Sequence, residues 1–360
     1  MTHYINPSQK ILRHFDRLAA WQNGELFPPV SLEMDLSERC NLGCDFCAFR
    51  YTHSHDPLTT GTTDLRYAEM GDLMDFDLAK RIISQMAEYG MKSFSFSGGG
   101  EPLFHPRFSD IVRHADDVGL QTGLYTNGTL IDDERAQTIK RYCEWVAVSI
   151  DEPNREAYRK TKQIDLFAQA CNGVRRLMQA EGKATVGLSF SSSWDGTSDD
   201  EVWDTLHQID TLRTVLGVDY CQVRPRMIFN FDDPAQPGED MAWVDKVLPV
   251  LERAALRYPG IDIRADKFHR YAHFERDYKV CYGVLFTGCI TANGRVWQCV
   301  NRRGFPESLI GDLTTEPFAE VWARKRPQTD FSRCRIACCG DDMTRTLYKL
   351  SQPIPHQDFM

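Results

Sequence analysis

Three cysteines, Cys40, Cys44 and Cys47, stand at C-x3-C-x2-C spacing and constrain this 360-residue chain more than any other feature. They come directly after the alternating apolar run from Val30 to Leu36, which predicts a half-buried strand. Three thiolates this close in sequence can hold three corners of an iron–sulfur cluster. A structural zinc ion or an electron-transfer cluster takes four ligands, so three ligands leave one iron open. The spacing alone leaves a zinc knuckle or incidental thiols as alternatives.

A glycine-rich turn from Ser97 to Pro102 follows the next predicted strand. Its glycines, Gly98, Gly99 and Gly100, have no side chains, so their N–H and C=O groups can meet a zwitterionic ligand. Glu101 either shapes the loop or helps to bind an ammonium group. Taken alone, a stretch of this kind is usually only a turn.

Both motifs, in this order, resemble those of the radical S-adenosylmethionine (SAM) superfamily, including the aromatic Phe46 before the third cysteine. The resemblance implies that the three cysteines hold a [4Fe–4S] cluster whose open iron is chelated by SAM. It also implies that the glycine turn binds the SAM amino group and that Phe46 lies against the adenine. In that family one electron cleaves SAM to methionine and a 5′-deoxyadenosyl radical, which abstracts a substrate hydrogen atom. A flavodoxin or ferredoxin-type donor would supply the electron.

Six strand-like runs alternate with segments of helical periodicity between residues 30 and 225. This alternation predicts βαβ units, a parallel sheet and right-handed crossovers that curl it. The resemblance implies an α/β fold, a partial (β/α)6 TIM-like barrel followed by a small α+β domain. We expect a lead-in helix in residues 1–29, the barrel in 30–230, a helical linker region in 231–280, an auxiliary domain in 281–345 and a tail in 346–360.

Polar residues stand at the ends of several predicted strands, where α/β barrels bind ligands. Thr126 and Asn127 are expected cofactor contacts after the third strand. Ser149 matches the position on the family's fourth strand that contacts the ribose. Arg224 is expected to meet the SAM carboxylate or an anionic substrate group, and it is the one residue assigned a catalytic role. For each of these four residues, the alternative is that it only caps a helix or forms part of a turn.

A second cysteine series begins at Cys281, with twelve residues before Gly294 and four more before Cys299. This pattern resembles the opening of the SPASM and twitch auxiliary domains. Asn293-Gly294 predicts a β-hairpin between the two cysteines. Because the series is too short for a full SPASM domain, it fits the twitch form with one auxiliary [4Fe–4S] cluster.

The resemblance implies a ligand set for this auxiliary cluster of Cys281, Cys299, Cys334 and Cys338. Cys339 is the alternative to Cys338, and Cys289 stands too close to Gly294 for the pattern. A C-terminal zinc ribbon stays open as well, since four thiolates also suit zinc.

Composition limits the partners and the compartment. A net charge of −9 predicts no basic face for nucleic acid. No apolar run approaches the ~20 residues that span a bilayer, and the N-terminus lacks a signal pattern. We therefore expect a cytoplasmic protein whose twelve cysteines are metal ligands and buried thiols rather than disulfides.

The combination of two clusters resembles the twitch dehydrogenases, so we expect oxidation of a small-molecule alcohol of a sugar or an aminocyclitol, with the auxiliary cluster as electron acceptor. The alternative is a peptide-modifying maturase or epimerase. The ~30 residues before the first strand leave no room for the ~80–90-residue leader-binding module that many maturases carry. A non-catalytic iron–sulfur or zinc protein is a third reading. The sequence singles out no general base.

Overall fold

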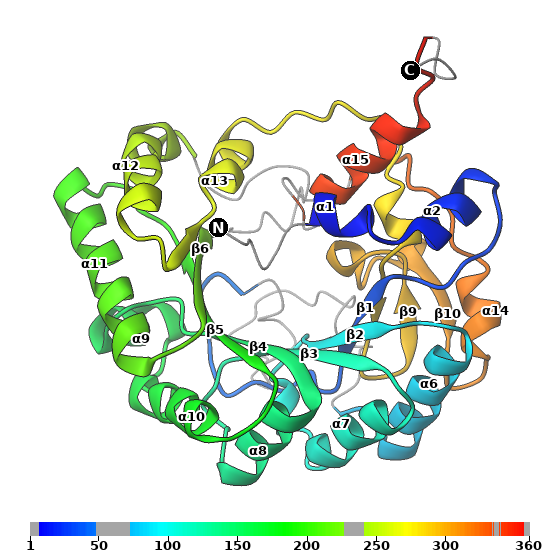
Figure 1. Cartoon of the computed structure of the whole chain (residues 1–360), viewed down its shortest axis with the longest axis horizontal. Helices are drawn as coiled ribbons and strands as arrows, with labels where there is room; N and C mark the ends of the chain where they lie inside the picture. Colours follow the sequence, from blue (N-terminus) through cyan, green and yellow to red (C-terminus); the bar gives the residue numbers. More distant parts are fainter. Residues whose placement is uncertain are drawn as a thin grey trace.

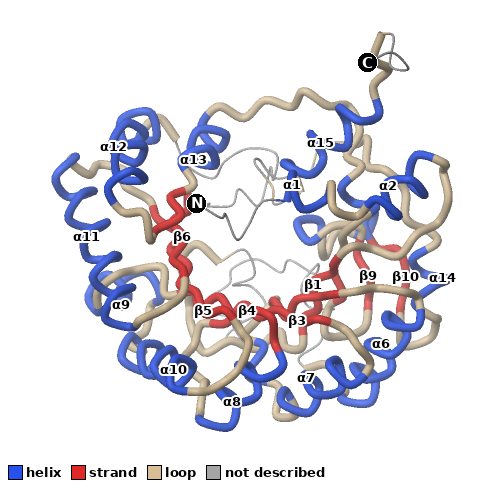
Figure 2. Tube along the Cα trace, in the orientation of Figure 1, coloured by secondary structure: helices blue, strands red, loops and turns tan. Residues whose placement is uncertain are grey.

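The computed structural model describes residues 7–47, 73–226, 241–332, 334, 338 and 340–355. Ten strands of this part of the chain form one sheet in the order β10-β9-β8-β1-β2-β3-β4-β5-β6-β7. Strands β1 to β7 pair in parallel and curve into an open barrel (Figure 1, Figure 2). Their bounds are β1 (Ser31–Asp35), β2 (Ser93–Ser97), β3 (Gln121–Thr126), β4 (Cys143–Ser149), β5 (Thr185–Ser192), β6 (Tyr220–Pro225) and β7 (Ile261–Ile263).

Helices cover the outer face of the barrel, because each presents an apolar stripe to the sheet (Figure 1). In α6 (Phe76–Glu88), Ile82 and Met86 are fully buried. The Asp75 side chain begins this helix by accepting the Leu78 N–H at 2.9 Å. No helix in the described ranges is both long and apolar enough to cross a membrane. The other helices of this layer are α7 (Phe108–Asp117), α8 (Asp133–Tyr142), α9 (Arg155–Lys162), α10 (Phe167–Gln179), α11 (Asp199–Leu216) and α12 (Trp243–Arg257). Helix α13 (Ala265–Ala272) instead borders a cavity, which its Lys267 and Tyr271 line.

The predicted α/β fold with a partial parallel barrel is confirmed, and it contains elements that the sequence did not predict. The three-residue strand β7 extends the barrel beyond six strands. Helix α9 was missed because its buried residues include only one large apolar side chain, Tyr158. The single predicted lead-in helix is two helices, α1 (Pro7–Ile11) and α2 (Phe15–Gln22).

The C-terminal strands continue the barrel sheet beyond β1. Strand β8 (Cys289–Ile290) pairs in parallel with β1, and β9 (Arg295–Trp297) and β10 (Leu309–Asp312) follow in antiparallel pairing. The hairpin predicted at Asn293-Gly294 is confirmed, with Gly294 at a φ of 84°. The second cysteine series is therefore attached to the strand that leads into the first one.

A small second core joins the two ends of the described chain. Helix α15 (Asp341–Ser351) lies beside α1 (Figure 1), and its Met343 and Leu347 pack with Ile11, Phe27 and Phe286. The short helix α14 (Phe318–Trp322) packs against α6 on the outside of the sheet.

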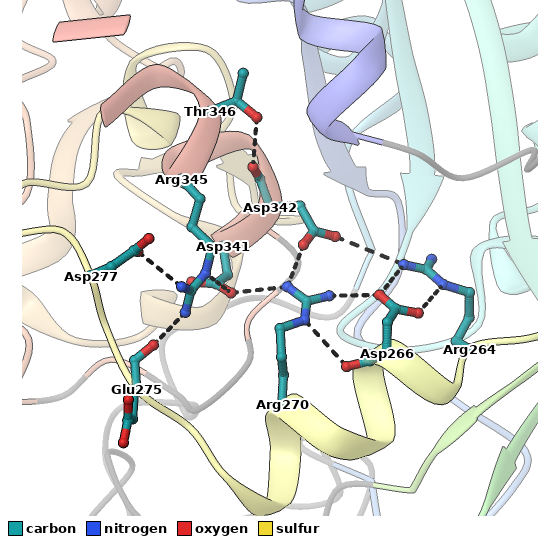
Figure 3. A network of polar contacts seen from close by, with 9 residues as sticks. All are labelled: Arg264, Asp266, Arg270, Glu275, Asp277, Asp341, Asp342, Arg345 and Thr346. Atoms are coloured by element: carbon teal, nitrogen blue, oxygen red, sulfur yellow. Dashed lines mark hydrogen bonds and ion pairs between the residues drawn. The ribbon is translucent and has the colours of Figure 1, made fainter. Parts of the chain in front are cut away.

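A network of ion pairs fastens α15 to α13 (Figure 3). Arg270 on α13 lies 3.0 Å from Asp341 and also pairs with Asp342 and Asp266. Arg345 on α15 lies 3.0 Å from the same Asp341. The Asp341 side chain is fully buried, and both guanidinium groups bind its Oδ2 atom, so its charge is compensated inside the protein. The C-terminal helix is thereby anchored to the last helix of the barrel.

Candidate active site

A cavity of about 410 Å³ opens at the C-terminal ends of strands β1 to β6. Parallel strands place the residues that follow them at one rim, so segments distant in sequence meet here. Every barrel residue that the sequence analysis selected lines this cavity: Cys40, Cys44, Phe46, Cys47, Gly98, Gly99, Gly100, Glu101, Thr126, Asn127, Ser149 and Arg224. Their individual roles stay predictions.

The three-cysteine loop is held in place by the last turn of α9. The Gly43 N–H donates to the Lys162 carbonyl at 3.0 Å, and the Asp45 N–H donates to the Thr161 carbonyl at 3.2 Å. These bonds use carbonyl groups that the end of a helix leaves without intrahelical partners. The position of the loop is therefore set by a helix that follows it by more than a hundred residues in the sequence.

Burial disfavours the thiolate forms of Cys40 and Cys44 when no metal is bound. Burial raises the pKa of Cys40 to about 12, and Glu101 and the other two thiols act in the same direction. Burial also raises the pKa of Cys44, against the opposing charge of Lys162. Iron binding must therefore displace the protons, which couples cluster assembly to pH.

The glycine turn packs directly on the residues that precede Cys40. A Cβ atom at Gly99 would lie 1.5 Å from the Glu38 carboxylate, and one at Gly100 would lie 2.2 Å from the Arg39 carbonyl oxygen. The Gly100 N–H donates to the Ser37 carbonyl at 2.9 Å. Both glycines are therefore required by packing against the cysteine loop, apart from any contact with a ligand.

Glu101 shapes the loop, which was one of its two predicted roles. Its Oε1 accepts from the Thr126 hydroxyl at 2.6 Å and from the Leu103 N–H at 3.2 Å, and its Oε2 accepts from the Asn127 N–H at 2.7 Å. Burial raises the pKa of Glu101, and these hydrogen bonds oppose the rise. The Asn127 amide nitrogen in turn lies 3.9 Å from the Cys40 sulfur. The carboxylate thus joins the ends of β2 and β3 beside the first cysteine.

A buried ion pair between Lys162 and Asp151 forms another wall, and sequence reasoning missed the lysine. Both side chains are 3% exposed. Burial alone would raise the pKa of Asp151, but Lys162 lowers it below its usual value. Asp151 also accepts the Ser191 N–H at 2.9 Å. The only sequence signal for Lys162 was its position at the end of a polar helix.

Phe46 lies between two cations rather than against an apolar surface. The Lys162 ammonium is 5.3 Å from its ring centroid, and the Arg226 guanidinium is 5.0 Å from it. Such contacts stabilise a cation over an aromatic face. Arg226 also pairs with Glu152, so the ring is held by residues that follow β4 and β6.

Glu33 and Arg303 bring charge to the cavity from β1 and from the C-terminal segment, and neither was predicted. Arg303 pairs with the buried Asp35 and lies 3.4 Å from Glu33. Burial raises the pKa of Glu33, and Arg303 opposes this. Arg224 donates to the Ser191 hydroxyl at 3.3 Å and also acts on Glu33. Glu33 carried a sequence signal, since it is an acidic residue in an alternating apolar run.

The second cysteine set gathers beyond β1. Burial raises the pKa of Cys299 to about 11, and the neighbouring Cys281 and Cys334 add to the rise. Cys338 and Cys281 both act on Tyr278, whose pKa burial raises. The thiols of Cys281 and Cys334 therefore lie near Cys299, and Cys338 and Cys281 lie near the same tyrosine. The alternative ligand Cys339 lies outside the described residues.

Cys289, which the sequence pattern left out of the predicted ligand set, contacts a carboxylate of β1. Its sulfur lies 3.9 Å from Asp35 Oδ2 on the barrel side of the sheet. The cause is register, because β8 pairs Cys289 with Glu33 of β1. Cys143, Cys171 and Cys221 are buried thiols of the barrel, as expected.

A sequence profile described as "Radical SAM superfamily" matches residues 34–209, which include the three-cysteine loop and the glycine turn. Residues 34–209 thus carry a radical SAM domain. Members of this superfamily use a [4Fe–4S] cluster and SAM. Streptococcus suis SuiB bound to S-adenosylmethionine has the same fold, with a TM-score of 0.61 at 14% identity over 89% of this chain and 72% of that chain.

Two curated radical SAM relatives differ in how much of the chain they match. The AdoMet-dependent heme synthase of Methanosarcina barkeri is 26% identical over 82% of this chain and 82% of its own length. The tungsten-containing aldehyde ferredoxin oxidoreductase cofactor-modifying protein of Pyrococcus furiosus is 38% identical to this chain. That match covers only 29% of this chain and 25% of the relative's own length. Because these relatives differ in activity, the radical SAM domain does not specify the substrate.

The barrel cavity fits the cofactors of a radical SAM enzyme. Three thiols line it beside a turn whose bare backbone packs on the cysteine loop. In a [4Fe–4S] cluster each thiolate binds its own iron, so three thiols at the wall of the cavity suit three of its corners. Cys40, Cys44 and Cys47 would hold the cluster, and the glycine turn would face SAM.

Proposed function

We propose that this radical SAM enzyme oxidises an alcohol of a small molecule, such as a sugar or an aminocyclitol, to a carbonyl group. The observation that supports this is the position of Val300, Asn301 and Arg303, which line the barrel cavity. They directly follow Cys299, so a cluster on the second cysteine set would lie just behind the wall of the substrate cavity. When bound, SAM and the two clusters would supply a hydrogen-abstracting radical and an electron acceptor.

Oxidation of a CHOH group to C=O removes one hydrogen atom, one proton and one electron. The proton needs a base in the cavity, and we assign that role to Glu33. The described residues of the cavity include three carboxylates, of Glu33, Glu101 and Asp151. Glu101 is committed to its loop, and Asp151 is paired with Lys162. Glu33 also faces Arg303 at 3.4 Å, but its side chain is 25% exposed and burial raises its pKa, which suits a base that meets the substrate.

The test incubates the reconstituted, reduced enzyme with SAM and a panel of sugar alcohols and aminocyclitols. We expect 5′-deoxyadenosine and a product lighter by two hydrogen atoms in equal amounts, measured by mass spectrometry. A product of unchanged mass would contradict oxidation and favour an epimerase. With the accepted substrate, Glu33→Gln is expected to slow product formation by about 10²–10⁴-fold. The exposed Glu156→Gln variant on α9 serves as the matched control.

A second candidate is synthesis of heme, since the relative that covers 82% of this chain carries that name. The same incubation with an iron-porphyrin precursor would distinguish the two proposals. Formation of heme, identified by its mass, would support heme synthesis and contradict the alcohol dehydrogenase.

A further inference from the structure

Lys325 is a buried lysine beside the second cysteine set. Its side chain is 6% exposed, and its ammonium group lies 4.5 Å from the ring centroid of Trp322. The Nζ atom donates to three backbone carbonyls, those of Val284 and Thr287 at 2.7 Å each and that of Gln298. A buried amine is costly unless each of its N–H groups has an acceptor, and here all three do.

These three carbonyls belong to both cysteine-bearing segments. Val284 and Thr287 follow Cys281, whereas Gln298 directly precedes Cys299. Lys325 therefore ties the segment of the first ligand to the segment of the second.

Arg326 and Gln328 form further hydrogen bonds with the same two segments. The Gln298 side chain donates to the Arg326 carbonyl. Cys281 and Gln328 exchange backbone hydrogen bonds of 2.7 and 3.1 Å. Residues 325–328 thus connect the segment that carries Cys281 to the segment that carries Cys299.

The geometry fixes Lys325 as an ammonium ion. Three carbonyl oxygens can only accept, so they require three N–H donors, which the neutral amine does not have. Burial lowers the pKa of Lys325 to about 7, and Cys299, Cys281 and, less strongly, Cys289 act in the opposite direction. Among the described residues, no carboxylate lies within ion-pair distance of this ammonium group. Its positive charge is therefore directed at the thiols.

We infer that Lys325 is a positioning residue of the second cysteine site, and that its charge raises the reduction potential of the cluster held there. The inference rests on the proposed function, which places an electron-accepting cluster on these cysteines. A fixed cation stabilises the reduced cluster, which carries one more negative charge than the oxidised one. Net charge near a cluster is one of the factors that set its potential. The lysine would make this cluster a better acceptor for an electron leaving the cavity.

The experiment uses the full chain with Cys40, Cys44 and Cys47 replaced by alanine, so that only the second site can hold iron. After anaerobic reconstitution, iron content is measured and the reduction potential is titrated by electron paramagnetic resonance. In this background Lys325→Met is expected to shift the potential to more negative values. At a fixed potential the ratio of reduced to oxidised cluster should fall at least about tenfold.

Two further variants separate charge from loss of structure. Lys325→Gln keeps an N–H donor without the charge and should shift the potential in the same direction. Val321→Ala weakens the buried packing of α14 while keeping the lysine, so it should lower the melting temperature and leave the potential unchanged.

Three outcomes of these measurements would contradict the inference. Iron retained with an unchanged potential in both lysine variants would overturn the inference. Loss of iron from both variants, with Val321→Ala still loaded, would also overturn it, because Lys325 would then be needed for ligation. A background protein with Lys325 intact that takes up zinc or no iron refutes the proposed function itself, and the inference with it.

Discussion

Each cysteine set has one buried lysine beside it, and the two lysines are held in different ways. In the barrel, Lys162 lies next to Cys44 and forms an ion pair with Asp151. At the second site, Lys325 lies near Cys299 and donates its hydrogen bonds to three backbone carbonyls beside the Trp322 ring. The first charge is balanced by a carboxylate, and the second is not.

This difference teaches what each site is built to do. A balanced pair keeps the barrel cavity close to neutral, so the charges that SAM brings can decide its binding. An unbalanced ammonium leaves a net positive potential on the second site, which favours acceptance of an electron. The barrel site relies on side-chain carboxylates for its shape, whereas the second site relies on backbone carbonyls.

The largest expected effect comes from removing the barrel lysine. Lys162→Met leaves Asp151 buried without its cation, and breaking such a pair costs about 3–5 kcal/mol of unfolding free energy. Urea denaturation of the metal-free chain measures this. The double variant Lys162→Met/Asp151→Asn should recover much of the loss, because no uncompensated charge remains. Equal losses in the single and double variants would contradict the pairing.

Next in size is the effect of removing the carboxylate that joins β2 to β3. Glu101→Gln preserves the size of the side chain but replaces one of two acceptor oxygens with an NH₂ group. The buried Asn127 N–H or the Thr126 hydroxyl then loses its acceptor, at a cost of about 1–3 kcal/mol. Thermal unfolding beside the exposed Glu156→Gln control measures this. A Glu101→Gln variant as stable as the control would refute the structural role of the carboxylate.

The pH dependence of the barrel pair gives a smaller effect. Because Lys162 holds the pKa of Asp151 below its usual value, the pair stabilises the fold fully above the ordinary carboxyl pKa of about 4. The contribution is lost as pH falls through the lower folded-state pKa. The stability difference between wild type and the Lys162→Met/Asp151→Asn variant should therefore be constant from about pH 5 to 9 and change only below about pH 4. A change across neutral pH would contradict this assignment.

The smallest effect is expected from an exposed ion pair between the start of α9 and the loop that follows this helix. Arg155 and Asp165 lie 2.6 Å apart, but the arginine side chain is 74% exposed. Solvent screens such pairs, so Asp165→Asn should leave the unfolding midpoint unchanged. A loss comparable to that of Lys162→Met would show that burial does not explain the strength of the barrel pair.

The residues that could be predicted from the sequence are those whose chemistry lies in short motifs. The three barrel cysteines and the glycine turn are local patterns, and βα alternation brought the strand ends of Ser149 and Arg224 to the same cavity. The parallel sheet followed from periodicity, and the partial barrel from the resemblance to the family. These features depend on spacing along the chain, which a sequence displays directly.

The residues that were missed depend on contacts between distant segments. Lys162 reaches Cys44 only because the cysteine loop docks on the end of α9. Arg303 reaches Asp35 only because β8 continues the barrel sheet beside β1. Lys325 serves two segments that precede it in the chain by ~30–40 residues, and no local pattern marks such a residue.

The central claim is that the chain holds two iron–sulfur clusters on two separate cysteine sets. Iron and acid-labile sulfide per chain, measured after anaerobic reconstitution together with SAM cleavage, test it most directly. The account predicts about eight irons in the native protein and about four in each alanine variant, with 5′-deoxyadenosine lost only when the barrel set is replaced. About four irons in the native protein and none without the barrel set would contradict it. The two sets to replace are Cys40, Cys44 and Cys47, and Cys281, Cys299, Cys334 and Cys338.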